Sequence, residues 1–205
     1  MRVILPITCA LAIVAMPSAA KQPLNFEITP LIGYRFGGDF NTSQEAVHGR
    51  VELTEATSYG VIAGWSIDRA HKGEFLVSHY DTDFSKSGDF SASDTSLGIT
   101  YAHLGGSVSV SEGALPVYVT GGLGLTHFSP EDADLGNETR FSMNVGIASK
   151  IPLTERISFL LAGRLYGTFF NSDSAVFCDF DTCAIYVSSS VWVQSELNAG
   201  ITFKF

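Results

Sequence analysis

The chain has 205 residues and a formal net charge of -9, which becomes -10 if Arg2 leaves with an N-terminal signal. That acidic balance excludes a sequence-independent grip on nucleic acid, which needs a basic face. The mean hydropathy is +0.21, yet no apolar run beyond residue 16 is long enough for a membrane-spanning helix, so the composition indicates β-strands.

The first 20 residues predict a secretory signal peptide. They begin with a positive charge, continue as an apolar run over residues 3–16, and end in Ser18-Ala19-Ala20, the small residues that a signal peptidase accepts. A retained membrane helix is the alternative, but Pro17 interrupts the run before it reaches about 20 apolar residues. We therefore expect cleavage after Ala20 and a single mature domain over residues 21–205.

Eight segments of the mature chain alternate between apolar and polar residues. This period of two is that of a β-strand, whose successive side chains point to opposite faces. Most of the segments exceed the roughly 5 to 6 residues of a soluble strand and suit the roughly 9 to 11 that cross a membrane. The segments are residues 26–36, 57–67, 74–80, 95–104, 116–128, 140–150, 157–169 and 191–205.

The connections between these segments alternate in length. The short ones are residues 68–73, 111–115 and 152–156, and the long ones are residues 37–56, 81–94, 129–139 and 170–190. Membrane barrels with both termini in the periplasm have short turns there and long loops outside. The sequence therefore predicts an all-β fold, an eight-stranded antiparallel up-and-down transmembrane β-barrel with short periplasmic turns and long extracellular loops.

The last segment assigns the two faces. One parity contains Val193, Leu197 and Phe203 and should meet lipid, while the other contains Glu196 and Lys204 and should face the lumen. In the first segment, Pro30 has no N–H to donate to a neighbouring strand, and a closed barrel offers no free edge. We expect a bulge or one missing hydrogen bond at that position.

The same alternation points six charged side chains into the lumen. They are Glu27, Glu74, Lys150, Arg164, Glu196 and Lys204. A buried charge needs a partner. We expect two ion pairs, Glu27 with Lys204 near the periplasmic rim and Arg164 with Glu196 on neighbouring strands, which plug the lumen. An ion gate is the functional alternative, although eight strands leave little room for one.

Few residues suggest chemistry. Cys178 and Cys183 lie in one long loop, and an oxidising periplasm should join them as a disulfide. The histidines are scattered without metal-ligand spacing, so no metal is expected. The candidate catalytic pairs are Ser78-His79 and His127-Phe128-Ser129, but neither has the surrounding residues of a lipid A deacylase. The acidic long loops could hold divalent cations that bridge to lipopolysaccharide phosphates. They are interpreted as solvated, because no calcium-loop spacing is present.

At this level of detail the sequence resembles the small outer-membrane β-barrel superfamily that includes the OmpA transmembrane domain and the OmpX and OmpW types. The matching features are the signal peptide, the eight alternating segments, the opening strand of residues 26–34 and the terminal residues 201–205. The resemblance implies a bacterial outer-membrane location. It also implies that Phe203 and Phe205 form the signal read by the barrel-assembly machinery. It specifies architecture better than function, because this fold carries pores, adhesins and enzymes.

We expect a non-enzymatic integral outer-membrane protein with a structural or surface-interacting role. It should need no cofactor, act as a monomer, and contact outer-membrane lipid and lipopolysaccharide through its wall and an unnamed ligand through its loops. The alternative is a narrow channel for ions or small hydrophobic compounds, as in the OmpW type. Inward apolar residues make that conceivable: Leu31, Ile62, Leu76, Leu104 and Leu160. Less favoured are a lipid A-modifying enzyme and a soluble periplasmic binder, in which Phe203 and Phe205 would point inward.

Overall fold

The computed structural model describes residues 25–38, 40–44, 47–85, 96–111, 113, 115–131, 136–170, 174–178, 183–187 and 191–205. Within these ranges, only the backbone is described at 40–44, 47–52, 84–85, 174–178 and 183–187. The expected signal peptide and its cleavage after Ala20 lie outside the described residues. No helix of the described part is long and apolar enough to cross a membrane.

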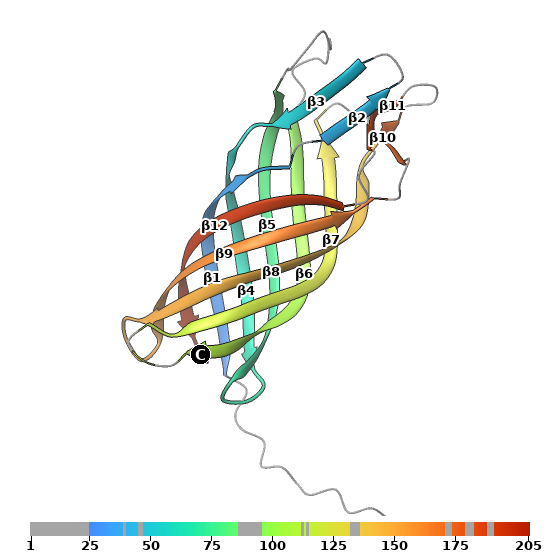
Figure 1. The fold of residues 1–205 in the computed structure, drawn as a ribbon. Coiled ribbons are helices and arrows are strands. Elements are labelled where there is room, and N and C mark those ends of the chain that lie inside the picture. Colours follow the sequence, from blue (N-terminus) through green and yellow to red (C-terminus); the bar gives the residue numbers. More distant parts are fainter. Residues whose placement is uncertain are drawn as a thin grey trace, which may run out of the picture.

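Eight antiparallel strands of 11 to 16 residues close into a barrel (Figure 1). Each strand pairs with the next along the chain, and the last pairs with the first, so that the described wall has no free edge. The wall strands are β1 (Phe26–Phe36), β4 (Ala56–Ser66), β5 (His71–Ser85), β6 (Ser96–Ser111), β7 (Val117–Pro130), β8 (Glu138–Pro152), β9 (Ile157–Phe169) and β12 (Val191–Lys204). This confirms the predicted fold class.

Short turns and the C-terminus lie at one end of the barrel (Figure 1). In the turn between β4 and β5, Asp68 accepts backbone hydrogen bonds from His71 and Ala70, both at 2.8 Å. These bonds, with the His71 side chain, hold the pKa of the exposed Asp68 carboxyl below its ordinary value. The Asp68 side chain therefore stabilises the turn by accepting hydrogen bonds from two of its backbone amides.

Two of the expected long loops contain strands of their own. β2 (Phe40–Gln44) pairs with β3 (Val47–Leu53), and β10 (Ser174–Cys178) pairs with β11 (Cys183–Val187). The two hairpins meet where β11 pairs with β2, and β3 continues into the wall through β5. The end opposite the short turns therefore carries a small sheet rather than only irregular loops (Figure 1).

The β10–β11 hairpin places the two mature cysteines directly opposite each other, Cys178 against Cys183. Opposed residues of an antiparallel pair have Cα atoms about 4.5 to 5.5 Å apart, within the range that a disulfide spans. The cysteine side chains lie outside the described residues, so the disulfide stays a prediction. The mass of the non-reduced protein should be lower by two hydrogens, and Cys183→Ser should abolish that difference; free thiols in protein from an oxidising compartment would contradict it.

Pro30 interrupts one hydrogen-bond ladder without shifting it. On the β4 side, Pro30 remains paired with Val61, but on the β12 side the ladder is broken between Ile28 and Leu31. The register is the same on both sides of the gap. The ladder therefore lacks hydrogen bonding at Pro30, as one expectation had it, and contains no bulge there. Thr29 and Thr202 bridge the gap with a hydroxyl–hydroxyl hydrogen bond of 2.8 Å. The closing seam of the barrel is therefore held there by side chains.

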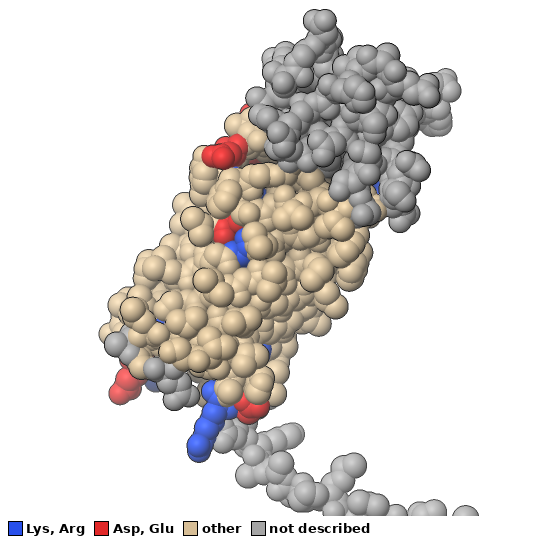
Figure 2. Space-filling view, in the orientation of Figure 1, with Lys and Arg blue, Asp and Glu red and all other residues tan. Residues whose placement is uncertain are grey.

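The outward face of the wall is apolar. Ile147 is 64 % exposed and Leu197 is 61 % exposed, whereas charged atoms gather mainly toward the two ends of the barrel (Figure 2). The terminal Phe203 and Phe205 also point outward, with exposed fractions of 40 % and 75 %. A soluble binder would have the reverse arrangement, so this observation excludes it.

Leu104 is a correction to the expected faces. It is 61 % exposed on the outside of β6, not directed into the lumen. The inward residues of β6 are instead Leu97, Ile99, Tyr101 and His103, all fully buried. Because apolar side chains occupy both faces of this strand, hydrophobicity alone does not identify its outer side.

Candidate functional site: the filled lumen

A buried ion pair crosses the middle of the lumen. The Arg35 Nη2 atom lies 2.9 Å from the Glu196 Oε1 atom, and both side chains are fully buried. Arg35 also donates to Ser78 Oγ at 2.9 Å, and Ser58 donates to the same carboxylate. Tyr166 donates its hydroxyl to Glu196 Oε2 at 2.6 Å. The charges are thus neutralised and hydrogen-bonded together, as burial in a low dielectric requires.

Three tyrosine rings surround the Arg35 guanidinium. Its Cζ atom lies 4.7 Å from the ring centre of Tyr80, 4.5 Å from that of Tyr101 and 4.4 Å from that of Tyr166. All three distances are within cation–π range. Gln194 accepts a hydrogen bond from Tyr101 and donates one to Tyr80, so the tyrosine hydroxyls are themselves held in place. The cage therefore holds Arg35 beside Glu196 among fully buried side chains.

A second charged cluster lies toward the short-turn end. The Glu27 carboxylate accepts from Lys72 Nζ at 2.8 Å and forms a buried ion pair with Lys150. The Glu74 carboxylate lies 3.8 Å from Lys150 and 3.6 Å from Arg164. A single connected network therefore joins two carboxylates and three cations.

Arg164 is held mainly by neutral partners. It donates to Thr120 Oγ1 at 3.1 Å and lies 3.4 Å from the Asn144 side-chain oxygen. The hypothetical Cβ of Gly146 would fall 2.9 Å from Arg164 Cγ, so the guanidinium stem lies directly over a residue that has no side chain. Glycine at this inward position makes room for the long side chain from the next strand.

The expected ion pairs differ from those found. The six predicted side chains lie on the lumen side, with Lys204 half-buried and the others buried. Glu196 pairs with Arg35 rather than Arg164, and Glu27 pairs with Lys150 and Lys72 rather than Lys204. Glu27 does lie opposite Lys204 in register, and Glu196 opposite Arg164. The charged groups at the ends of these side chains nevertheless contact other residues. The expected set also leaves out four charged residues that lie on the lumen side of the described wall: Arg35, Lys72, Glu138 and Arg140.

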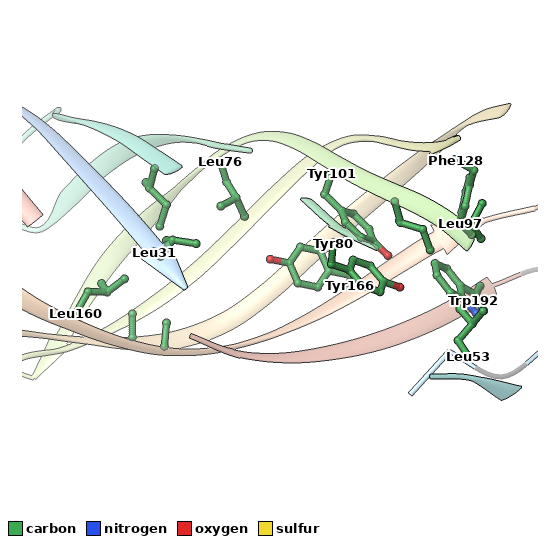
Figure 3. Close-up of a cluster of buried hydrophobic side chains, with 14 of the residues drawn as sticks. Leu31, Leu53, Leu76, Tyr80, Leu97, Tyr101, Phe128, Leu160, Tyr166 and Trp192 are labelled. Atoms are coloured by element: carbon green, nitrogen blue, oxygen red, sulfur yellow. The ribbon is translucent and has the colours of Figure 1, made fainter. Parts of the chain in front are cut away.

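An apolar cap fills the lumen at the end that carries the hairpins. Figure 3 shows Leu97, Phe128 and Trp192 together at one end, the tyrosine cage in the middle, and Leu31, Leu76 and Leu160 beyond it. The Phe128 ring lies 5.6 Å from the Trp192 ring and 5.9 Å from that of Phe170. The cap side chains are 0 to 4 % exposed, so they exclude water from this end.

The chain between β1 and β2 is tied to this cap. Gly37 and Gly38 both have positive φ angles, of 79° and 102°. Trp192 donates its ring N–H to the Gly38 carbonyl at 2.7 Å, and Gln194 donates to the Gly37 carbonyl at 3.3 Å. The root of the β2–β3 hairpin therefore lies against the cap, and Leu53 at its other root is buried in the same cluster.

The two glycines give a matched pair of substitutions. A Cβ on Gly38 would lie 2.8 Å from Trp192 Cζ2, whereas one on Gly37 meets only a backbone oxygen at 3.9 Å. We expect Gly37→Ala to cost about 1 kcal/mol, from its backbone conformation alone. Gly38→Ala should cost about 2 to 3 kcal/mol because a steric clash is added. Urea unfolding in detergent micelles measures both, and equal losses would contradict the packing of Gly38 against Trp192.

The residues weighed for catalysis do not assemble. Ser78 faces the lumen and bonds to Arg35 and Glu196, whereas His79 faces outward and bonds to Thr100. His127 is hydrogen-bonded to Thr139 at 2.8 Å. No group of three or more potential metal ligands occurs among the described residues.

One serine–histidine contact is present inside the barrel. His103 Nε2 lies 2.8 Å from Ser142 Oγ, but both residues are fully buried. No described group is hydrogen-bonded to His103 Nδ1, so the orienting carboxylate of a catalytic triad is missing from the described residues. This pair fills the lumen rather than exposing a nucleophile to a substrate.

Comparison with known proteins gives likeness in structure only. No family model matches the chain, and no curated protein sequence matches it. The outer membrane protein OprG from Pseudomonas aeruginosa superposes with a TM-score of 0.61 and 13 % identity, over 89 % of this chain and 96 % of OprG. The fold is that of a small outer-membrane β-barrel.

Two further solved structures have the same fold. Neisserial surface protein A superposes with a TM-score of 0.58 and 14 % identity, over 88 % of this chain and 97 % of that protein. The outer membrane protein AlkL, solved in lipid bilayers, superposes with a TM-score of 0.52 and 13 % identity, over 100 % of this chain and 97 % of AlkL. The shared fold and the apolar outer face are together those of a barrel built for the bacterial outer membrane.

Proposed function

We propose that this outer-membrane barrel is closed and non-enzymatic, and that it acts through its outward surfaces rather than by passing solutes. The observation that carries the proposal is the burial of inward side chains at successive levels of the lumen. From the Glu27–Lys150 pair, through the Arg35–Glu196 pair, to Trp192 in the cap, inward side chains are buried. An eight-stranded barrel is just wide enough to be filled in this way.

Conductance across a planar lipid bilayer tests the proposal. The wild-type barrel should give no steady current steps at moderate voltage. Phe128→Ala/Trp192→Ala, which empties the cap, is the sensitised variant and should give transient steps. Phe141→Ala/Phe169→Ala is a matched control, because these rings also stack, at 5.7 Å, but on the outside of the wall. A steady open channel in the wild type would contradict a closed barrel.

The second candidate is a narrow passage for small hydrophobic compounds. It is favoured by the apolar and aromatic character of the cap and by the hairpin root held over it by Trp192. Uptake of an apolar fluorophore by cells that produce the protein distinguishes the two candidates. A closed barrel leaves uptake unchanged. A passage raises uptake, and the increase should disappear when a crosslink fixes residue 38 against the cap.

Assembly and oligomeric state follow as further parts of the proposal. Phe203 and Phe205 lie outward at the end of β12, and the Phe205 N–H donates to the Phe26 carbonyl at 2.9 Å. They are therefore accessible at the closing seam, where the barrel-assembly machinery would read them. We propose a monomer, since the eight strands close on themselves and need no second copy to pair an edge.

A further inference from the structure

A continuous row of polar side chains crosses five wall strands on the outside. Tyr59, His79, Thr100, His127 and Thr139 lie on β4, β5, β6, β7 and β8, and each is directly opposite the next in register. None of the five faces the lumen. We call this set the polar row.

Side-chain contacts within the polar row hold it together across the strands. His79 Nδ1 lies 2.9 Å from Thr100 Oγ1, and His127 Nδ1 lies 2.8 Å from Thr139 Oγ1. Asp81, two residues beyond His79 on the same face, approaches His79 Nε2 at 3.3 Å. The Asp81 side chain remains 75 % exposed and the Tyr59 residue 62 % exposed. The row is thus ordered and still open to the surroundings.

The polar row marks the upper edge of the apolar belt on one side of the barrel. Toward the short-turn end, the next outward residues are apolar, among them Val61, Leu125 and Phe141. On β9 and β12, by contrast, apolar side chains continue to the end of the strand at Phe169 and Val191. Polar residues thus replace the apolar wall on β4 to β8 at the level where hydrocarbon gives way to headgroups.

We propose that the polar row and Asp81 bind the sugar headgroup of an outer-leaflet glycolipid of the lipopolysaccharide class. Imidazoles, hydroxyls and a carboxylate donate to and accept from sugar hydroxyls, and the exposed Tyr59 ring offers an apolar face for a sugar to pack on. These six residues include no lysine or arginine and one carboxylate, so the row suits hydroxyl groups better than phosphates. This inference rests on the outer-membrane position in the proposed function, with the hairpin end outside, but not on the closed lumen.

Lipopolysaccharide retention tests the inference directly. The purified barrel is placed in nanodiscs with rough lipopolysaccharide, and native mass spectrometry measures how much stays bound after dilution. His79→Leu/Asp81→Asn should weaken retention by about tenfold, as expected from losing one or two hydrogen bonds to the ligand. The matched control is Asp68→Asn/His71→Leu, which removes another histidine–aspartate contact, of 2.9 Å, at the short-turn end. That variant should retain lipopolysaccharide like the wild type.

A second variant and two changes of ligand complete the test. Thr100→Val/Thr139→Val keeps the side-chain shape and should also lower retention while the barrel still migrates as folded on an unheated gel. Retention that survives removal of divalent cations and of lipid A phosphates supports sugar recognition. Unchanged retention in both row variants would overturn the proposal, as would retention lost with EDTA or dephosphorylation. Bilayer conductance is a separate readout, so a conducting wild type would remove the closed lumen and leave the glycolipid site standing.

Discussion

Replacing Arg35 with alanine is expected to destabilise the folded barrel by about 3 to 5 kcal/mol, the cost of leaving a buried carboxylate without its cation. The Glu196 carboxylate would keep its bonds from Ser58 and Tyr166 but lose the only cation within 4 Å among the described residues. Glu196→Ala should cost a similar amount, because it leaves the guanidinium among three rings with only Ser78 to accept from it. Urea or guanidinium unfolding in micelles gives both values.

The double substitution separates the pair from its surroundings. Arg35→Met/Glu196→Leu removes both charges and keeps most of the volume, so it should cost less than the sum of the two single alanine substitutions. The control is Arg156→Ala, which removes an exposed arginine from the turn between β8 and β9. That change should stay within about 0.5 kcal/mol. A loss below about 1 kcal/mol for Arg35→Ala would refute the central role of the mid-lumen pair.

Alternation in the sequence determines which side of the wall a residue faces, because the side-chain period of a strand is fixed at two. The face of Glu27 follows from its apolar neighbours Phe26 and Ile28, and that of Glu196 from the apolar residues of the opposite parity, such as Val193 and Leu197. The same logic assigns Arg35, which shares its parity with Glu27 and could have been counted among the lumen charges. Where both faces are apolar, as around Leu104, the alternation carries no such information and the assignment fails.

Ion-pair partners cannot be read from register in the same way. Glu196 lies opposite Arg164 on one side and opposite Arg35 on the other, so register offers it two cations. Glu196 pairs with Arg35 because the tyrosine rings and Ser78 hold the guanidinium beside it, through cation–π contacts and a hydrogen bond. These contacts cannot be read from the linear sequence. Long side chains also reach across the lumen, so that residues of β5 and β8 converge on Glu27 from β1.

The β2–β3 hairpin was missed although its sequence contains a signal. Residues 47–53 alternate between apolar Val47, Val51 and Leu53 and polar His48 and Arg50. The sequence analysis treats the segment as part of the long, polar connection of residues 37–56. The β2–β3 hairpin extends from the wall at β5 and is not one of the eight strands that close the barrel. An even number of wall strands is therefore compatible with it.

The contrast between Lys150 and Lys204 gives the second large effect. Lys150→Ala should cost about 3 kcal/mol, because it removes the buried ammonium that contacts Glu27 and lies near Glu74. Lys204→Ala should cost no more than about 0.5 kcal/mol, since its long side chain lies half-buried at the rim and can keep its charge in water. Both residues are lysines on the lumen side of the short-turn end, so each is the control for the other.

Glu27→Ala extends the same test to the shared carboxylate. It removes the acceptor of Lys72 and Lys150 together, so it should destabilise the barrel at least as much as Lys150→Ala. In a Glu27→Ala background, the effect of Lys150→Ala should shrink by well over 1 kcal/mol, because the two residues interact directly. The Lys204→Ala effect should stay the same in that background. If Lys204 rather than Lys150 lost its effect there, the register neighbour would be the true partner and the charge network of the short-turn end would have to be redrawn.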